Sequence, residues 1–405
     1  MTNTKANPRK GASGEAVKPD PAAAVTTPAN KPHARMPGQP RPPPTAHPPF
    51  TMRDIRNAIP KHCFERSLWR SMSYVVADAI GVAVLAYGAS FIDASPLPAA
   101  AKWALWAGYW FLAGNVMTGL WVLAHECGHQ AFSKSKLVNN VMGTILHSAL
   151  LVPYHPWRVS HANHHSNCCS IEHDEVFIPS TRSALGEALA ESPISSLWGV
   201  VQMLVFGWPA YMFCNAGGPR KYDNKVADHF SPWSALFLPQ HYWLVVQSDI
   251  AWLVAVGGVA YAIHLFGFTT VAAYYLIPYM VVNANLVAIT YLQHTDTYVP
   301  HYREGAFTNM RGKLSTVDRS VGFIDYLWHH ITDTHVLHHI DHSIPHYHAE
   351  EATEAIKPLL GDYYLSDSTN FLAALYRSGV HCRCIPDDGD YIFFVGPDND
   401  TRKSD

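Results

Sequence analysis

The chain has 405 residues, of which 48% are hydrophobic and only 15% are charged. So low a charge content indicates that much of the surface does not face water, and the net charge of −3 gives no reason to expect a nucleic-acid partner. The seven cysteines form neither a zinc-ligand framework nor an even disulfide set, which favours a reducing, cytosol-facing environment. The 25 histidines are the unusual feature of the composition.

The N-terminal stretch, residues 1–48, is rich in Pro, Ala, Thr, Lys and Arg and has no hydrophobic period, so we expect a disordered tail. It shows no apolar run typical of a secretory signal, whereas a basic organelle transit peptide stays an alternative. The sequence Thr51-Met52-Arg53-Asp54 predicts a helix start. The amphipathic segment that follows, through Arg70, is basic and would suit a cytosolic membrane surface.

Four apolar stretches are predicted to cross a bilayer: 74–91, 103–123, 250–268 and 271–292. The first two form a hairpin whose short link carries one basic residue, Lys102, and the last two form a hairpin with a tight turn at Thr269-Thr270.

Two weaker apolar runs are predicted not to cross. Residues 141–151 are too short to span and would be interfacial or buried. Residues 195–213 are about long enough, but a crossing there would put His161 and His335 on opposite faces of the membrane. We therefore expect four crossings, with both termini on the cytosolic side and the segment from Lys357 onward contributing to a soluble cap.

Histidines gather in three clusters, each just outside a membrane-length stretch. A helix places residues at i, i+3 and i+4 on one face; the first cluster has two histidines at i and i+4, and the other two clusters each have three at i, i+3 and i+4. Imidazole is a preferred ligand of iron, zinc, copper and nickel, so the sequence predicts a metal site at the cytosolic membrane surface. The eight histidines are His125, His129, His161, His164, His165, His335, His338 and His339.

The order of these clusters and hairpins resembles the integral-membrane fatty acid desaturases, and within them the microsomal Δ12 (oleate) acyl-lipid branch. The resemblance covers about residues 48–375, and we divide the chain into a tail (1–48), a membrane desaturase domain (49–375) and a polar C-terminal tail (376–405). It is carried by the three clusters and by motifs beginning at Pro48, Ala58, Arg70, Asp174, Tyr291, Thr316, Thr332 and Pro345. Glu126 is typical of Δ12 members, whereas ω-3 members tend to carry Asp there. Ala162 and Asn163 replace two arginines of the plant pattern, which weakens inference of substrate from plant relatives.

The resemblance implies an all-α membrane protein with four transmembrane helices as two hairpins and a cytosolic helical cap that holds a histidine-rich di-iron centre. It implies His294 as a ninth ligand, since this residue ends the fourth stretch and the family supplies an extra histidine there. It further implies O2 as co-substrate, a fatty acyl lipid substrate such as phospholipid-bound oleate, and electrons from NADH through cytochrome b5 reductase and cytochrome b5. The endoplasmic reticulum is preferred to the plastid as location.

Carboxylates are expected beside the ligands, because a metal-bound imidazole usually donates its other N–H to an acceptor. Glu126, Asp174 and Asp333 are the candidates. The other histidines near the clusters are expected to be surface or supporting residues rather than ligands: His301, His329, His330, His342, His346 and His348.

Other functions stay open. An ω-3 (Δ15) desaturase, a hydroxylase, an acetylenase or a conjugase would use the same ligands and differ in how the acyl chain is positioned. A histidine-rich zinc transporter or receptor would place ionisable residues inside the spans, whereas His264 is the main such residue here.

Overall fold

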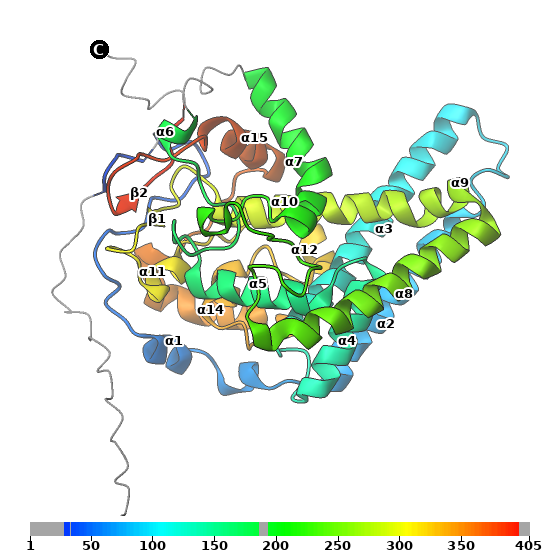
Figure 1. Cartoon of the computed structure of the whole chain (residues 1–405), viewed down its shortest axis with the longest axis horizontal. Helices are drawn as coiled ribbons and strands as arrows, with labels where there is room; N and C mark the ends of the chain where they lie inside the picture. The colour runs from blue at the N-terminus through cyan, green and yellow to red at the C-terminus, as the bar shows by residue number, and fades with distance from the viewer. Residues whose placement is uncertain (1–27, 33, 186–192, 397–405) are drawn as a thin grey trace, which may run out of the picture.

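The computed structural model describes residues 28–32, 34–185 and 193–396, and these are mostly helical (Figure 1). The one sheet among them is a short antiparallel pair, β1 (His301–Tyr302) with β2 (Tyr391–Ile392). The predicted helical membrane protein is thus confirmed in its class.

Two helical hairpins extend from one end of the molecule. α2 (Leu68–Ala89) packs along α3 (Ala99–Gly128). α8 (Tyr242–Phe266) leads into a second long helical stretch, which packs beside α3. This stretch consists of α9 (Phe268–Val271), one π-helical segment (Ala272–Leu276) and α10 (Ile277–His294).

The turn of the second hairpin lies two residues earlier than predicted. It falls at Gly267, whose φ of 80° suits a residue without a Cβ atom. Thr269 and Thr270, the predicted turn residues, belong to α9.

Four helical segments are long and apolar enough to cross a membrane: Leu68–Ala89, Ser195–Cys214, Pro239–Phe266 and Phe268–His294. The set differs from the prediction, because it contains α7 (Pro193–Cys214) and lacks α3. α3 is absent from the set because its many Trp, Tyr and Gly residues lower its mean hydropathy, although it is long enough to span. By length and composition this is a membrane protein.

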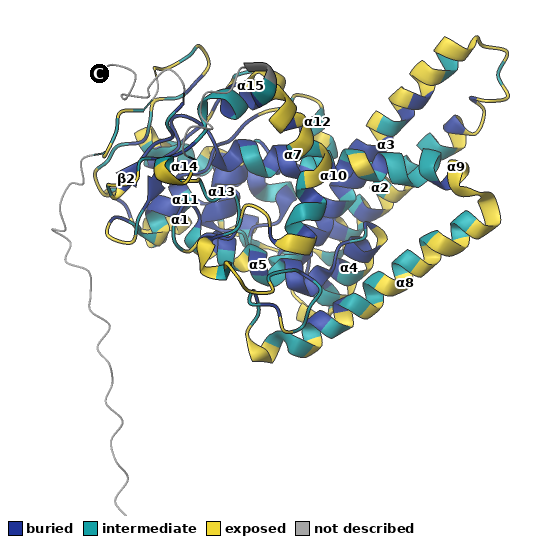
Figure 2. Cartoon of the chain, turned by 45° about the horizontal axis from the view of Figure 1, so that its top comes forward, coloured by how far each residue is buried: buried dark blue, intermediate teal, exposed yellow. Residues whose placement is uncertain are grey.

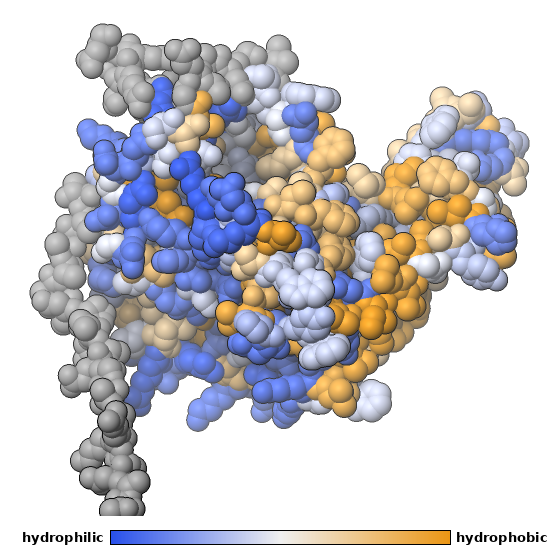
Figure 3. Space-filling view, in the orientation of Figure 1, coloured by the Kyte–Doolittle hydropathy of each residue, from blue (hydrophilic) through white to orange (hydrophobic). Residues whose placement is uncertain are grey.

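The hairpins carry hydrophobic side chains on their outer faces, as a lipid contact requires (Figures 2 and 3). Val84 of α2 and Val254 of α8 are among the exposed side chains. On α4 (Lys136–Ala149), Leu137, Val141 and Ile145 form an exposed stripe at four-residue spacing. That stripe agrees with an interfacial position for residues 141–151.

The predicted basic helix after Thr51 is shorter than expected. α1 (Met52–Ala58) begins with a capping box in which Thr51 accepts from the Asp54 N–H. Pro60, which has no N–H to continue the helix, precedes a 3-10 turn, η1 (Lys61–Phe64), and α2 begins only afterwards.

Part of the predicted N-terminal tail lies against the body of the protein. The amide of Gln39, a buried side chain, donates to Asp296 Oδ1 at 3.1 Å, and Asn30 Nδ2 donates to the Phe393 carbonyl at 2.9 Å. Residues 28–48, apart from 33, are thus placed by contacts, whereas the predicted disorder of residues 1–27 lies outside the described part of the chain.

The predicted boundary at 375/376 cuts through a helix, α15 (Phe371–His381). Arg377 in this helix is buried and donates to Asp296 Oδ2 at 2.5 Å and to Asp367 Oδ2 at 2.6 Å. Phe393 is also buried. The segment up to residue 396 is therefore part of the packed body, because its aromatic and charged side chains find partners there.

Shorter elements form a cap at the other end of the hairpins, at the left of Figure 1. The remaining elements are α5 (Tyr154–Asn167), α6 (Arg182–Leu185), η3 (Arg220–Tyr222), η4 (Pro239–His241), α11 (Asn309–Leu314), α12 (Ile324–Leu327), α13 (His335–Ile340), η6 (His346–His348), α14 (Ala349–Leu360) and η7 (Gly361–Tyr363).

Candidate metal centre

The three histidine clusters lie on helix ends and short helices that meet between the hairpins and the cap. The first cluster ends α3, the second lies on α5, and the third forms α13. His294 is the last residue of α10. α13 is held at its start by Asp318, whose Oδ1 accepts from the Val336 N–H at 2.7 Å.

A first group of donor atoms comes from α3, α5 and α13. The Nε2 atom of His129 lies 3.1 Å from that of His125 and 3.0 Å from that of His161. His165 Nε2 lies 3.1 Å from His161 Nε2 and 3.2 Å from His338 Nε2. These five imidazoles form group one.

A second group of donor atoms combines His294 of α10 with the remaining cluster histidines of α5 and α13. His294 Nε2 lies 3.3 Å from His164 Nε2 and 3.2 Å from His335 Nε2. His339, with His164, His294 and Cys168, has a donor atom within 4.8 Å of the others. The four imidazoles form group two. The two groups adjoin, because the His165 and His339 rings stack with centroids 4.1 Å apart.

Hydrogen bonds among imidazoles do not account for this arrangement. A neutral imidazole has one N–H, so a set of Nε2 atoms facing one another leaves lone pairs directed at lone pairs. His339 Nε2 is buried and has no hydrogen-bond partner at all. This nitrogen and the Nε2 lone pairs that face one another would cost free energy unless a cation occupied the space between them.

The donor set fits two metal ions. Ligand nitrogens about 2.1 Å from one ion and at right angles lie roughly 3 Å apart, as the Nε2 atoms do here. Burial holds the pKa of His161, His165, His338 and His339 well below the ordinary value, so these imidazoles are neutral and their lone pairs are free to bind. All nine predicted ligand histidines thus lie in the two groups.

The three predicted carboxylates differ in their partners. Asp174 accepts from His164 Nδ1 at 2.7 Å and from the Cys169 N–H at 2.7 Å. Glu126 is 3.7 Å from His125 Nδ1, and its hydrogen bond, at 3.0 Å, comes from the backbone N–H of His346. Asp333 pairs with His330 at 3.0 Å rather than with a cluster histidine.

Two further residues lie beside the groups: Cys168, which the sequence analysis does not single out, and His342, which is expected there only as a surface or supporting residue. Cys168 Sγ lies 3.4 Å from His294 Nδ1, and the His342 ring lies 4.6 Å from the His129 ring. The signal for both was helical spacing, because Cys168 follows His164 by four residues and His342 follows His338 by four. The other histidines named as supporting residues contribute to neither group.

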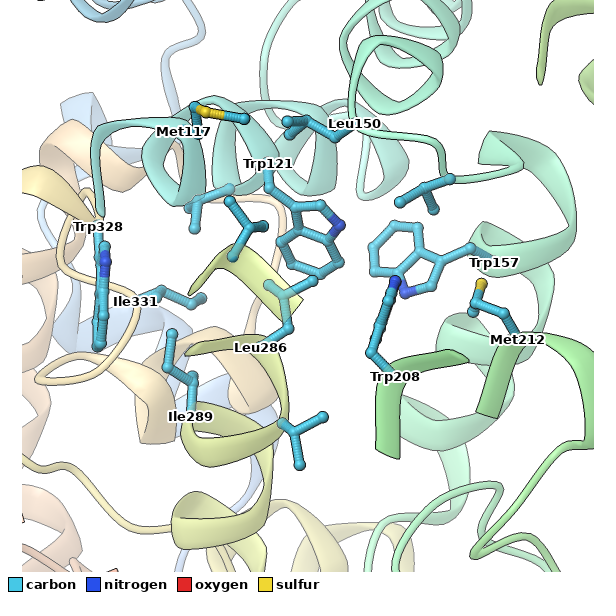
Figure 4. Packing of buried hydrophobic residues seen from close by; sticks show 14 residues of the cluster. Met117, Trp121, Leu150, Trp157, Trp208, Met212, Leu286, Ile289, Trp328 and Ile331 are labelled. Atoms are coloured by element: carbon cyan, nitrogen blue, oxygen red, sulfur yellow. The ribbon is translucent and has the colours of Figure 1, made fainter. Parts of the chain in front are cut away.

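An apolar cluster adjoins the metal centre on the side of the long helices (Figure 4). Trp157 stacks on His161 with centroids 4.5 Å apart, and Trp121 on His125 at 5.7 Å. Trp208 from α7 and Leu286 from α10 belong to the same cluster, and Figure 4 shows Trp208 beside Trp157 and Leu286 beside Trp121. The metal centre therefore borders on hydrocarbon-like surroundings.

Comparison with known proteins shows the family of the chain. Residues 101–371 match the family model described as fatty acid desaturase, which covers more than half of the chain. The chain belongs to the fatty acid desaturase family. Residues 26–87 match a second model, described as a domain of unknown function.

Named relatives come from fungi and plants. The chain is 45% identical over 366 residues to a Δ(12) fatty acid desaturase of Mortierella isabellina, a match that spans 86% of this chain and 91% of the relative. It is 44% identical to a Δ(12)-acyl-lipid-desaturase of Punica granatum, over 85% of this chain and 89% of the relative. It is 41% identical to an ω-6 fatty acid desaturase, endoplasmic reticulum isozyme 1, of Glycine max, again over 85% and 89%.

Proposed function

We propose that this desaturase introduces a cis double bond at the Δ12 position of oleoyl chains, giving linoleoyl chains. The observation that supports this most is the convergence of nine histidines into two donor groups beside an apolar aromatic cluster. The Δ12 position rests on the names of the fungal and plant relatives and on Glu126.

Two iron ions held by groups one and two would supply the oxidising power that removal of hydrogen from an unactivated methylene with O2 requires. The protein's part is to hold neutral imidazoles at fixed positions. Asp174 accepts from His164 Nδ1, which fixes the tautomer so that His164 Nε2 presents its lone pair. Burial of seven of the nine histidines limits the access of bulk water to the reacting carbons.

The acyl chain would lie along the apolar cluster. Trp121 and Trp157 contact both that cluster and the ligand rings, so a methylene passing them would lie next to the metal centre. The oleoyl group would reach the site from the bilayer as part of a phospholipid, since the outer faces of the hairpins are apolar.

The remaining parts of the proposal are location and electron supply. We place the protein in the endoplasmic reticulum membrane, with four crossings and with both termini and the metal centre on the cytosolic side. Electrons would come from NADH through cytochrome b5 reductase and cytochrome b5. Protease access to tags at both termini of intact microsomes tests the orientation, and a lumenal C-terminus would contradict it.

Fatty acid analysis after expression in a host that makes only monoenes tests the activity. We expect linoleate to form from the host's oleate, and none to form with His161→Ala. A hydroxylated or triple-bonded product, or activity only on added linoleate, would contradict the Δ12 proposal and support a hydroxylase, an acetylenase or an ω-3 desaturase instead.

A further inference from the structure

A second set of metal-binding side chains lies at the surface, outside groups one and two. It comprises His62 and Cys63 of η1, His348 of η6, and Glu351 of α14. One donor atom from each residue lies within 4.8 Å of the other three. We infer that these four residues bind one divalent transition metal ion, with zinc as the best match, and that this ion fastens η1 to η6 and α14.

The short distances in the set centre on one atom, His62 Nε2. It lies 2.9 Å from Glu351 Oε2 and 3.7 Å from Cys63 Sγ. Around a tetrahedral zinc ion, with about 2.0–2.1 Å to nitrogen or oxygen and about 2.3 Å to sulfur, neighbouring donor atoms lie roughly 3.3–3.6 Å apart. The ring of His348 stands edge-on to that of His62, with centroids 5.5 Å apart.

The chemistry of the set favours a metal ion over a simple ion pair. A His–Glu pair at the surface needs no thiol, yet Cys63 is fully buried with its sulfur directed at the pair. One sulfur, two imidazoles and one carboxylate are ligands typical of zinc, whereas an all-oxygen set would favour calcium or magnesium. His62 and Glu351 are each about half exposed, at 53% and 52%, which gives an ion a path from the solvent.

The ion would join segments far apart in the sequence. η1 precedes α2, whereas η6 and α14 follow the third histidine cluster, so the bond would span almost the whole described chain. The first residue of η6, His346, donates its backbone N–H to Glu126, which lies next to His125 in group one. A fastened η6 would therefore hold Glu126 in place, and this coupling goes beyond the proposed desaturase activity and does not depend on it.

The test is metal analysis of the full-length protein, purified in mild detergent from cells grown with added zinc. Mass spectrometry should find one zinc ion per chain in addition to the iron. His62→Ala and Cys63→Ser should each lose that zinc and keep the iron. Glu354→Gln, a matched control for Glu351→Gln on the same exposed face of α14, should keep both metals.

Cobalt substitution gives an independent measurement of the sulfur ligand. The protein loaded with Co²⁺ should show a thiolate-to-cobalt charge-transfer band that Cys63→Ser abolishes. Because His62 is exposed, His62→Ala leaves the packing intact, and its iron content reports that the fold is retained. No zinc in the wild type, or zinc that persists in both His62→Ala and Cys63→Ser, would overturn the inference, whatever the desaturase assay shows.

Discussion

The two donor groups of the metal centre differ in what stands behind the imidazoles. In group one, His125 Nδ1 and His165 Nδ1 have no hydrogen-bond partner. In group two, His335 Nδ1 and His339 Nδ1 likewise have no partner, but His164 Nδ1 donates to Asp174, and His294 Nδ1 faces the Cys168 thiol. Since a carboxylate behind a ligand fixes its tautomer and raises its basicity, group two should hold its ion more firmly than group one.

The difference also bears on how the centre is built. α5 supplies His161 and His165 to group one and His164 to group two, so one helix fixes the positions of ligands in both groups. The two groups share a scaffold and differ in polar support. Loss of a ligand should therefore abolish function in either group, whereas loss of the Asp174 carboxylate should affect group two more than group one.

The largest effect is expected from removing one ligand in each group. His161→Ala and His339→Ala should each lower desaturation more than about 100-fold, because an ion that loses a ligand is bound weakly and misplaced. The measurement is linoleate formed per chain in microsomes. His173→Ala, an exposed histidine close to α5, should stay near wild type. Substantial activity in either ligand variant would show that its group is dispensable.

Asp174→Asn should lower iron affinity by about 10- to 100-fold, and should do so at group two first. An amide can accept from His164 Nδ1 but carries no negative charge to strengthen the ligand. Titration of the purified protein with an iron chelator measures this. Asp333→Asn is the matched control, because Asp333 pairs with His330 instead. Equal effects of the two substitutions would remove the basis for distinguishing the groups.

Cys168→Ser should have a smaller effect, below about 10-fold on iron affinity, because a hydroxyl replaces a neutral thiol at His294 Nδ1. The same chelator titration applies, with the exposed Cys214→Ser as control. A complete loss of iron in Cys168→Ser would instead make the sulfur a direct ligand of group two.

The last prediction concerns the pH dependence of the stability of the whole protein, so it should not distinguish the two groups. His229 is buried and contacts Ser160 Oγ of α5 at 2.9 Å, and burial lowers its pKa to about 4. Because the folded protein keeps this imidazole neutral while the unfolded chain takes up a proton below about 6.5, stability should fall as the pH drops from 6.5 toward 4.

The size of that fall should be at most about 1.4 kcal/mol per pH unit for this one residue. Thermal unfolding of the detergent-solubilised protein at pH 7.5 and pH 5 measures it, and His229→Gln should reduce the difference. An unchanged pH dependence in His229→Gln would show that other groups carry the acid sensitivity.

Much of the fold and of the metal centre could be predicted from the sequence, because the relevant patterns are local. Histidines at i, i+3 and i+4 on α5 and α13 share one face whatever the rest of the chain does. The two hairpins follow from apolar length. The eight cluster histidines and His294 therefore lie together, as the spacing and the family resemblance indicate.

The parts that sequence could not supply depend on contacts between distant segments. Asp333 is close in sequence to His335 but pairs with His330, and no spacing rule distinguishes the two. α15 packs against the body because Arg377 donates to Asp296 and Asp367. The polar sequence around Arg377 gives no sign of these distant partners. α3 is long enough to span a membrane, but its Trp, Tyr and Gly residues lower its mean hydropathy, so α7 and not α3 has the apolar composition of a span.

The most direct test of the account is the metal content of active protein. Purified wild-type enzyme should hold two iron ions per chain in all-nitrogen surroundings, one for each donor group, and desaturation should rise in proportion to iron. Protein that is fully active with zinc as its only metal, or with a single iron ion per chain, would contradict the account.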